Sequence, residues 1–440
     1  MNLAELRPTL DFDRLGRDMF GLLADLYPIC RSITGHGLRE TLRRIQAHIP
    51  LIAHEVPTGT PVFDWVIPKE WNIRDAFIAN SQGERVVDFR QNNLHVWSYS
   101  VPVSATMSLA ELKPHLATLP QYPDWIPYRT SYYKEAWGFC LSQRTLDSLA
   151  EGPYEVCIDS SLEPGALTYG EYEICGKSRE TVLLSAHCCH PSLCNDNLCG
   201  IVTAVWLAKL LAPLSLRYSY RFVFAPGTIG AITWLARNES SAGSIRHGFV
   251  IAGGGDGGQF FYKRTRRETA EVDLAVEHVL KHWGTPYEVV PFVPYGYDER
   301  QYCSPGFNLP VGALSRTPHG RFPEYHTSAD NLGFVKAAHL AETLRLYLTI
   351  ISVLEGNLRY RNLNPKCEVQ LGKRGLYRST GGHTDQPLSE AALLWVLNLS
   401  DGDHSLLDIA IRSGIAFDAI YQATCALERQ GLVAPVGGRV

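Results

Sequence analysis

Residues 181–211 combine a short apolar run, a loop crowded with polar residues, and a second, longer apolar stretch. The run "TVLLSAH" is aliphatic and β-branched, which predicts a buried strand that ends at His187. The loop "CCHPSLCNDNLC" follows, and "GIVTAVWLAKLLAPL" then has the length and composition of a buried helix. A strand, a loop and a helix in this order restrict the chain to folds in which helices cover a sheet.

The same alternation continues to about residue 356. The segments "YSYRFVFAP" and "GSIRHGFVIAG" read as further strands, while "VDLAVEHVLKHWG" and "AAHLAETLRLYLTIISVLEG" have helical spacing. The sequence therefore predicts an α/β fold in which a mixed or parallel sheet is flanked by helices.

A chain of 440 residues is too long for one ordinary core, and its patterning changes twice. Residues 59–155 are rich in Trp, Tyr, Val and Pro with short alternating runs, which predicts an inserted β-rich domain. Residues 363–440 read as helix, short helix, turn at Gly414, longer helix and brief strand, the order of a winged helix-turn-helix. The α/β domain is then expected to comprise residues 1–58 and 156–362.

Composition narrows the functional classes. With 45% hydrophobic and 20% charged residues and a net charge of −4, the chain is globular and has no general affinity for nucleic acid. We expect no membrane span and no signal peptide, and hence a cytoplasmic protein. Its 11 cysteines are expected to be reduced thiols, since no CxxC pair supports a zinc ribbon or a redox motif.

Four residues at predicted strand ends and loops have the chemistry of metal ligands. His187 directly precedes the polar loop and Asp196 lies within it, Asp256 lies in "FVIAGGGDGG", and His326 lies in "PEYHTSADN". Functional groups gather at the carboxyl ends of strands in such sheets, and imidazole and carboxylate both suit zinc. Two alternatives stay open at this point: Asp196 as a helix cap, and a nucleophilic cysteine among Cys188, Cys189 and Cys194.

Several motifs carry a resemblance to a known superfamily. The string H-x-x-x-P followed by N-D-N-x-x-G, a later strand-end Asp and "YHTSADN" resemble the zinc aminopeptidases, a group with leucyl aminopeptidases, glutamate carboxypeptidases and glutaminyl cyclases. More closely, the chain resembles a bacterial aminopeptidase-like family with an inserted β domain and a C-terminal winged helix. The segments "IPYRTSYYKEAWGFC", "HCCHPSLCNDN", "DERQYCSPGFNLPVG" and "PEYHTSADN" carry this match across nearly the whole chain.

The resemblance implies a ligand set and a cofactor. His187, Asp196 and Asp256 would hold one zinc, and Asp196 would bridge to a second zinc that also uses His326. The sequence departs from the pattern where the superfamily has a Glu-Glu pair, general base then ligand. In "FAPGTIGAITWL", Gly227 stands at the base position and Thr228 at the second. A single zinc, or none, is then as plausible as two.

Glu299 and Glu324 are the candidate replacements for the missing base, because both lie in loops expected near the pocket. The expected substrate is a small aminoacyl or peptide-like amide. Four residues are expected to line the rim of the substrate pocket, and for each the alternative is ordinary packing of a surface loop: Arg300, Tyr302, Tyr325 and Tyr133.

Three functional hypotheses follow. The first is a zinc-dependent aminopeptidase-like hydrolase or acyl-transfer enzyme. The second is a catalytically degenerate protein that binds a ligand or partner through the old pocket, as Gly227 suggests. The third is a transcription factor. Residues 365–440 carry seven Lys/Arg against eight Asp/Glu, a net of −1, which disfavours DNA and favours packing or homo-oligomer formation through the winged helix.

Overall fold

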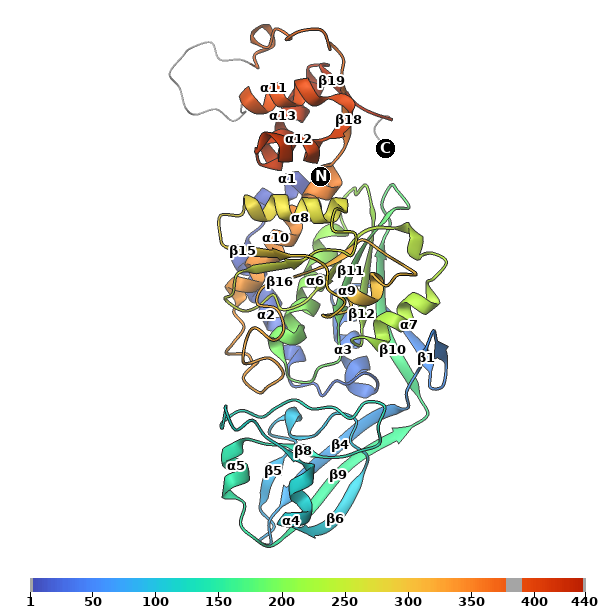
Figure 1. Ribbon diagram of the computed structural model, residues 1–440, viewed down its shortest axis with the longest axis vertical. Helices are drawn as coiled ribbons and strands as arrows, with labels where there is room; N and C mark the ends of the chain where they lie inside the picture. Colours follow the sequence, from blue (N-terminus) through green and yellow to red (C-terminus); the bar gives the residue numbers. More distant parts are fainter. Residues whose placement is uncertain (1–2, 377–389, 438–440) are drawn as a thin grey trace.

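The protein is elongated, with three parts arranged along its long axis (Figure 1). The computed structural model describes residues 3–376 and 390–437, so residues 377–389 and 438–440 of the predicted winged-helix range lie outside the described residues. In Figure 1 a small β-rich part lies at the bottom, an α/β part in the middle and a helical part at the top.

The middle part is built on an eight-stranded sheet in the order β1-β10-β12-β11-β13-β16-β14-β15. Strand β11 lies near its centre and runs parallel to both β12 and β13, whereas β10 is antiparallel to β1 and β12. This confirms the predicted mixed sheet. The strands are β1 (Ile52–Pro57), β10 (Ala166–Ile174), β11 (Thr181–His187), β12 (Ser219–Ala225), β13 (Ile245–Ile251), β14 (Phe260–Lys263), β15 (Tyr287–Val290) and β16 (Val311–Ser315).

Helices cover both faces of this sheet because β11 is apolar on both. Val182 and Leu184 pack into the larger core, shared with α6 and α10, while Leu183 packs into a second core shared with α7. A strand buried on both faces holds its last residue, His187, at a fixed point of the sheet edge. The helices are α1 (Leu3–Leu6), α2 (Phe12–Leu26), α3 (His36–Gln46), α6 (Cys199–Leu211), α7 (Ile229–Arg237), α8 (Glu271–Lys281), α9 (Glu299–Tyr302) and α10 (Ala337–Gly356).

The bottom part contains a four-stranded sheet in the order β5-β4-β9-β6. Its strand β9 extends to Glu163, past residue 155, because the alternating side chains Tyr154, Val156 and Ile158 are buried against β4 and β6 rather than in the central sheet. Its elements are β2 (Pro61–Val62), β3 (Trp65–Val66), β4 (Glu70–Ala79), β5 (Arg85–Asp88), β6 (Val103–Ser108), α4 (Leu109–Leu112), β7 (Leu116–Ala117), β8 (Phe139–Cys140), α5 (Gln143–Ser148) and β9 (Pro153–Glu163).

The top part has the helices and the small sheet of a winged helix. Gly414 ends α12 in the left-handed conformation that glycine favours, as the turn in the sequence predicts. The elements are β17 (Arg359–Asn362), α11 (Glu390–Leu399), β18 (Asp401–Ser405), α12 (Leu406–Ser413), α13 (Phe417–Arg429) and β19 (Val433–Pro435).

Helix α13, which corresponds to the recognition helix of such domains, starts against the α/β part. The Phe417 backbone N–H donates to His278 Nε2 of α8 at 3.1 Å, and Asp418 pairs with Arg7 at 3.2 Å. Phe417 is itself buried. The N-terminal turn that would enter a DNA groove is therefore occupied by contacts within the chain.

Helix α10 is long and apolar enough to cross a membrane by length and composition. Within the protein, most of this helix is buried, and it packs against α2, α6 and α8. A buried core helix passes the same test, so this is weak evidence for a span.

Phe417→Ala tests whether the winged helix is docked through this contact. We expect the free energy of unfolding to fall by about 3–5 kcal/mol, since a buried ring leaves a cavity. Urea titration measures it, with Ile411→Ala on the exposed face of α12 as the matched control, within about 0.5 kcal/mol of wild type. Equal effects of the two substitutions would contradict the docking.

Candidate metal centre and pocket

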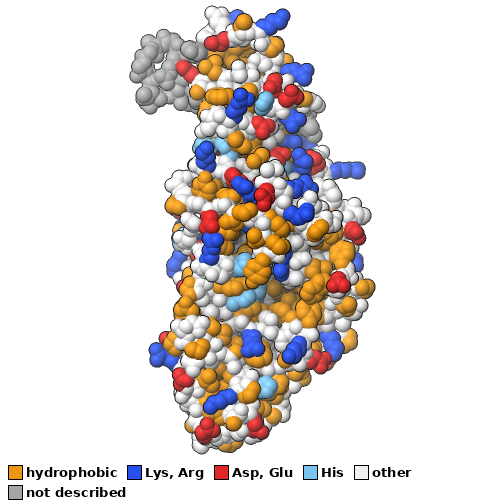
Figure 2. Space-filling model, viewed as in Figure 1, with side chains coloured by type: hydrophobic (Ala, Val, Ile, Leu, Met, Phe, Trp, Pro, Cys, Tyr) orange, Lys and Arg blue, Asp and Glu red, His pale blue; other side chains and the backbone are white. Residues whose placement is uncertain are grey.

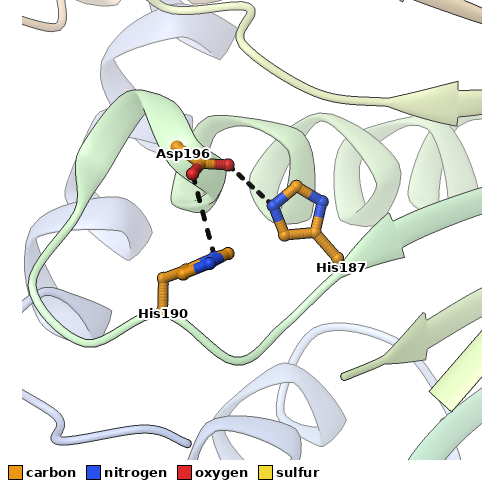
Figure 3. Close-up of side chains that lie close together, drawn as sticks. All are labelled: His187, His190 and Asp196. Carbon is orange, nitrogen blue, oxygen red and sulfur yellow. Dashed lines mark hydrogen bonds and ion pairs between the residues drawn. The ribbon is translucent and has the colours of Figure 1, made fainter. Parts of the chain in front are cut away.

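His187 and Asp196 meet at the carboxyl end of β11, as Figure 3 shows. His187 Nε2 forms a hydrogen bond of 2.8 Å with Asp196 Oδ1, and both side chains are buried. Asp196 comes from the irregular segment Cys194–Leu198 that leads directly into α6. The end of β11 and the segment before α6 thus bring together two atoms that can bind a metal, a nitrogen of His187 and an oxygen of Asp196.

His326 reaches the same carboxylate from the loop that precedes α10. Its Nε2 lies 2.9 Å from Asp196 Oδ2. The two atoms lack hydrogen-bond geometry, and within the described residues both are buried without a hydrogen-bond partner. Tyr325 stacks on the His326 ring at 3.9 Å, and Tyr128 packs edge-on against it. Buried polar atoms are nearly always satisfied, so these two atoms call for a further partner such as a bound ion.

His190 is a third imidazole at this carboxylate. Its Nδ1 lies 3.9 Å from Asp196 Oδ2, and ligand atoms of His187, His190 and Asp196 all lie within 4.8 Å of one another. Burial lowers the pKa of His190 to about 3, so the ring is neutral, the form that binds metal. Arg31 donates to the His190 backbone carbonyl at 3.0 Å and holds the loop in place.

The segment that carries Asp196 is held by its neighbours. Asp330 accepts hydrogen bonds from the backbone N–H groups of Asn195 at 2.6 Å and Asp196 at 3.0 Å. Asn197 donates to the Ile251 carbonyl at 2.9 Å. Burial raises the pKa of Asp330 to about 7. Burial also acts to raise the pKa of Asp196, but His190, His187 and His326 outweigh it and hold that pKa well below its usual range.

Asp256, the fourth predicted ligand, lies outside the group formed by His187, His190 and Asp196. Its carboxylate accepts from Asn195 Nδ2 at 3.4 Å and from the Gly258 backbone N–H at 3.1 Å, and it is buried. It does not belong to the group of ligand atoms around Asp196, nor does it line the pocket described next. The structure thus brings together His187, Asp196 and His326 of the four predicted ligands, and places His190, not Asp256, beside them.

A pocket of about 400 Å³ opens onto His187, His190 and Asp196. Figure 2 shows histidine side chains in a hollow near the middle of this face, bordered by hydrophobic side chains. The residues that line this pocket come from segments that are far apart in the sequence: Ile33, Trp65, Tyr132, Tyr133, His187, Cys189, His190, Asp196, Gly227, Thr228, Gly296, Tyr297, Asp298, Arg300 and Tyr325.

Asp298 faces this pocket beside Gly227. Its Oδ1 accepts the Thr228 backbone N–H at 2.7 Å, and the side chain is 4% exposed. Thr228 has a φ of 60°, a strained value for a β-branched residue that the hydrogen bond helps to maintain. Burial raises the pKa of Asp298, against the opposing effects of His187 and the Thr228 N–H. A carboxylate therefore remains in the pocket although position 227 has no side chain.

Three of the four predicted rim residues line the pocket: Arg300, Tyr325 and Tyr133. Arg300 Nη2 donates to Thr228 Oγ1 at 3.2 Å, and its Nε is buried without a hydrogen-bond partner among the described residues. Tyr302 points into the core instead, fully buried and hydrogen-bonded to Ser185 Oγ at 2.9 Å.

Neither predicted base lines the pocket. Glu299 is fully buried and forms an ion pair with Lys263, whose ammonium also donates to the carbonyls of Val293 and Tyr295. The pair holds the 291–298 loop, which carries Asp298. The side chain of Glu324 is only partly buried, and the backbone carbonyl of this residue caps the turn at Thr327.

Glu299→Gln is expected to destabilise the fold rather than remove a base. Leaving Lys263 buried without its partner costs about 3–5 kcal/mol of unfolding free energy, which denaturant titration measures. The turnover per folded molecule is expected to stay near that of wild type. A tenfold or larger loss of kcat in folded protein would contradict a role in stability alone, and would mean that Glu299 acts on the substrate or through the loop that carries Asp298.

Cys189 also lines the pocket, and its sulfur accepts the Gly227 backbone N–H at 3.3 Å. Burial raises the pKa of its thiol well above the ordinary value. A nucleophilic cysteine needs the opposite shift, so this geometry disfavours a cysteine hydrolase.

Three residues of the site were not predicted as functional: His190, Asp298 and Asp330. Each is adjacent or close in sequence to a residue that was. Asp298 directly precedes Glu299 in "YDERQY", but no sequence pattern distinguishes which of the two carboxylates faces the pocket.

The fold and the site together define an aminopeptidase-like α/β protein with a C-terminal winged helix. The chain belongs to the family described as "Domain of unknown function (DUF4910)", whose model matches residues 20–357. A winged helix-turn-helix model matches residues 358–435.

Individual proteins agree with this assignment. The chain is 56% identical over 418 residues to the Clostridium acetobutylicum protein named "Putative polysaccharide biosynthesis protein with aminopeptidase-like domain", covering 95% of this chain and 96% of that one. It is 53% identical to a C. acetobutylicum crystal structure titled "putative peptidase", with a TM-score of 0.93, covering 97% and 98% of the chains. The fold is shared with a zinc aminopeptidase of Bacillus subtilis, with a TM-score of 0.56 and 10% identity, covering 76% and 94%.

Proposed function

We propose that this chain is a cytoplasmic, zinc-dependent hydrolase or acyl-transfer enzyme that acts on an amide bond of a small aminoacyl substrate. One observation carries the proposal: His187, His190 and Asp196 line a pocket of about 400 Å³, and His326, from a distant part of the sequence, lies 2.9 Å from the Asp196 carboxylate. The aminopeptidase-like name of the relative and the shared fold support the peptidase-like class.

The donor set fits zinc. His187, His190, Asp196 and His326 offer nitrogen and oxygen atoms, and His326 Nε2 and Asp196 Oδ2, which lie 2.9 Å apart without a hydrogen bond, are positioned to bind a cation between them. A zinc ion held there would supply Lewis acidity toward a carbonyl oxygen and increase the acidity of water. The proposed ligand set thus replaces Asp256 with His190.

Asp298 is the proposed proton acceptor. It lines the pocket and accepts the N–H of Thr228, which orients it next to Gly227, the position at which the resemblance to the zinc aminopeptidases implies a base. A base so placed would accept a proton from the attacking water and return it to the leaving nitrogen. Arg300 would bind a carbonyl or carboxylate oxygen of the substrate.

Gly227 favours a second candidate, a ligand-binding protein without turnover. An added Cβ at this position would meet nothing closer than Cys189 Sγ at 3.5 Å, so space is not what requires the glycine. On this alternative the change marks a lost catalytic group rather than one replaced by Asp298.

Hydrolysis of a panel of aminoacyl amides distinguishes the two. The enzyme is expected to turn over at least one amide, to lose activity with a chelator and to recover it with zinc. His187→Ala should abolish turnover while the fold, measured by circular dichroism, is retained. Tight binding of amides without product in the zinc-loaded protein would contradict the enzyme and support the alternative.

A further inference from the structure

A second hollow lies next to the histidine-lined pocket, and its chemistry differs. It has a volume of about 630 Å³ and lies between the β2–β3 hairpin and the loop after α9. Trp65 lines both hollows, and neighbouring residues of α9 serve one each: Arg300 the first pocket and Gln301 the second. A ligand long enough to pass Trp65 would occupy both.

Aromatic rings form one wall of this second hollow. Phe63 and Trp65 lie on the hairpin, 53% and 39% exposed, unusually open for side chains of their size. Phe307 meets Phe63 edge-on with ring centroids 5.8 Å apart, and Trp65 meets Tyr133 at 5.3 Å. Figure 2 shows hydrophobic side chains continuing from the hollow with the histidines across this face.

Polar groups form the other walls. Asp64, Glu239, Gln301 and Ser304 line the hollow, and within the described residues their side chains form no hydrogen bond with one another or with other residues. No Lys, Arg or His is among the lining residues of this described region. Such a surface repels phosphate and other anions and offers acceptors to hydroxyl groups.

We propose that this hollow is a sugar subsite and that the substrate is an amino sugar carrying an aminoacyl amide. A pyranose presents C–H groups on its faces, which pack on aromatic rings, and hydroxyls at its edge, which carboxylates and amides accept. A compact organic cation would also suit aromatic and acidic groups, but it needs neither this volume nor four polar partners. The link to catalysis rests on the proposed function; the sugar subsite does not.

The test is direct binding of N-acetylglucosamine to the full chain, measured by saturation-transfer NMR and by calorimetry. We expect transfer to the ring protons and a Kd on the order of 1 mM. Trp65→Ala should weaken binding about three- to tenfold, and Glu239→Gln, an exposed position that cannot disturb the core, should weaken it as well. Tyr287→Ala is the matched control: Tyr287 is 40% exposed but lies on β15, away from this hollow, and should bind as wild type does.

The outcomes separate the two proposals. Binding that Tyr287→Ala weakens as much as Trp65→Ala, or no binding at all, would overturn the sugar subsite. Binding of tetramethylammonium in place of N-acetylglucosamine would overturn it too, in favour of a cation. Sugar binding that both Trp65→Ala and Glu239→Gln weaken, without hydrolysis of aminoacyl amides or N-aminoacyl glucosamine, would keep the subsite and defeat the proposed catalysis, since Glu239 lines only the second hollow.

Discussion

Asp298→Asn is expected to lower kcat for amide hydrolysis by about 10²–10⁴-fold, the contribution of a general base, while bound metal and the fold are retained. The asparagine keeps an oxygen that can accept the Thr228 N–H, which Asp298 now accepts at 2.7 Å, so the pocket wall should stay in place. What is lost is the ability to take a proton beside position 227. Steady-state kinetics of the zinc-loaded variant, with metal content measured on the same sample, check this.

The dependence of kcat/KM on pH distinguishes the loss of a base from a structural effect of Asp298→Asn. Burial raises the pKa of Asp298, and a base acts only after losing its proton, so kcat/KM of wild type should rise with pH through that pKa. This acid limb should vanish in Asp298→Asn and persist in Glu299→Gln. An Asp298→Asn enzyme with wild-type kcat would remove Asp298 from the mechanism.

Asp196→Asn is expected to release the metal and with it all measurable turnover. The Asp196 carboxylate lies 2.8 Å from His187 and 2.9 Å from His326, two of the proposed ligands, and a neutral amide binds zinc far more weakly than a carboxylate. The loss of zinc affinity should exceed the roughly 10–100-fold that follows loss of an outer partner. Equilibrium dialysis against zinc measures it.

Asp256→Asn is the matched control for that experiment. It changes a buried acid that accepts hydrogen bonds from Asn195 and Gly258 and does not contact the histidines. The asparagine can still accept the Gly258 N–H. It should bind zinc within the range of wild type. If Asp256→Asn loses the metal and Asp196→Asn retains it, the ligand set derived from the geometry is wrong.

The fold was predictable because its signals are local. An all-apolar strand ending at His187, a following apolar helix and a glycine at 414 each specify one piece of structure, and together they specify the α/β sheet and the winged helix. The strand from Tyr154 was harder to place, since its alternation suits any half-buried sheet and its partner β4 lies about 80 residues earlier.

The site was predictable only in part, because side-chain direction depends on distant contacts. His187, Asp196 and His326 follow from strand ends and motifs. Whether Asp298 or Glu299 faces the pocket depends on Lys263, which holds Glu299 in the core from another strand. Tyr302 is likewise drawn into the core by Ser185. Contacts between residues so far apart in the chain produce no periodic pattern in the sequence, so they could not be predicted from it.

The account depends most directly on a divalent ion bound by His187, His190, Asp196 and His326, and elemental analysis of untagged protein tests it. We predict at least about one zinc per chain in wild type, and loss of most of it in a His190→Ala variant that stays folded. Fewer than about 0.1 zinc per chain, with no uptake on titration with zinc, would contradict the metal centre and the hydrolysis derived from it.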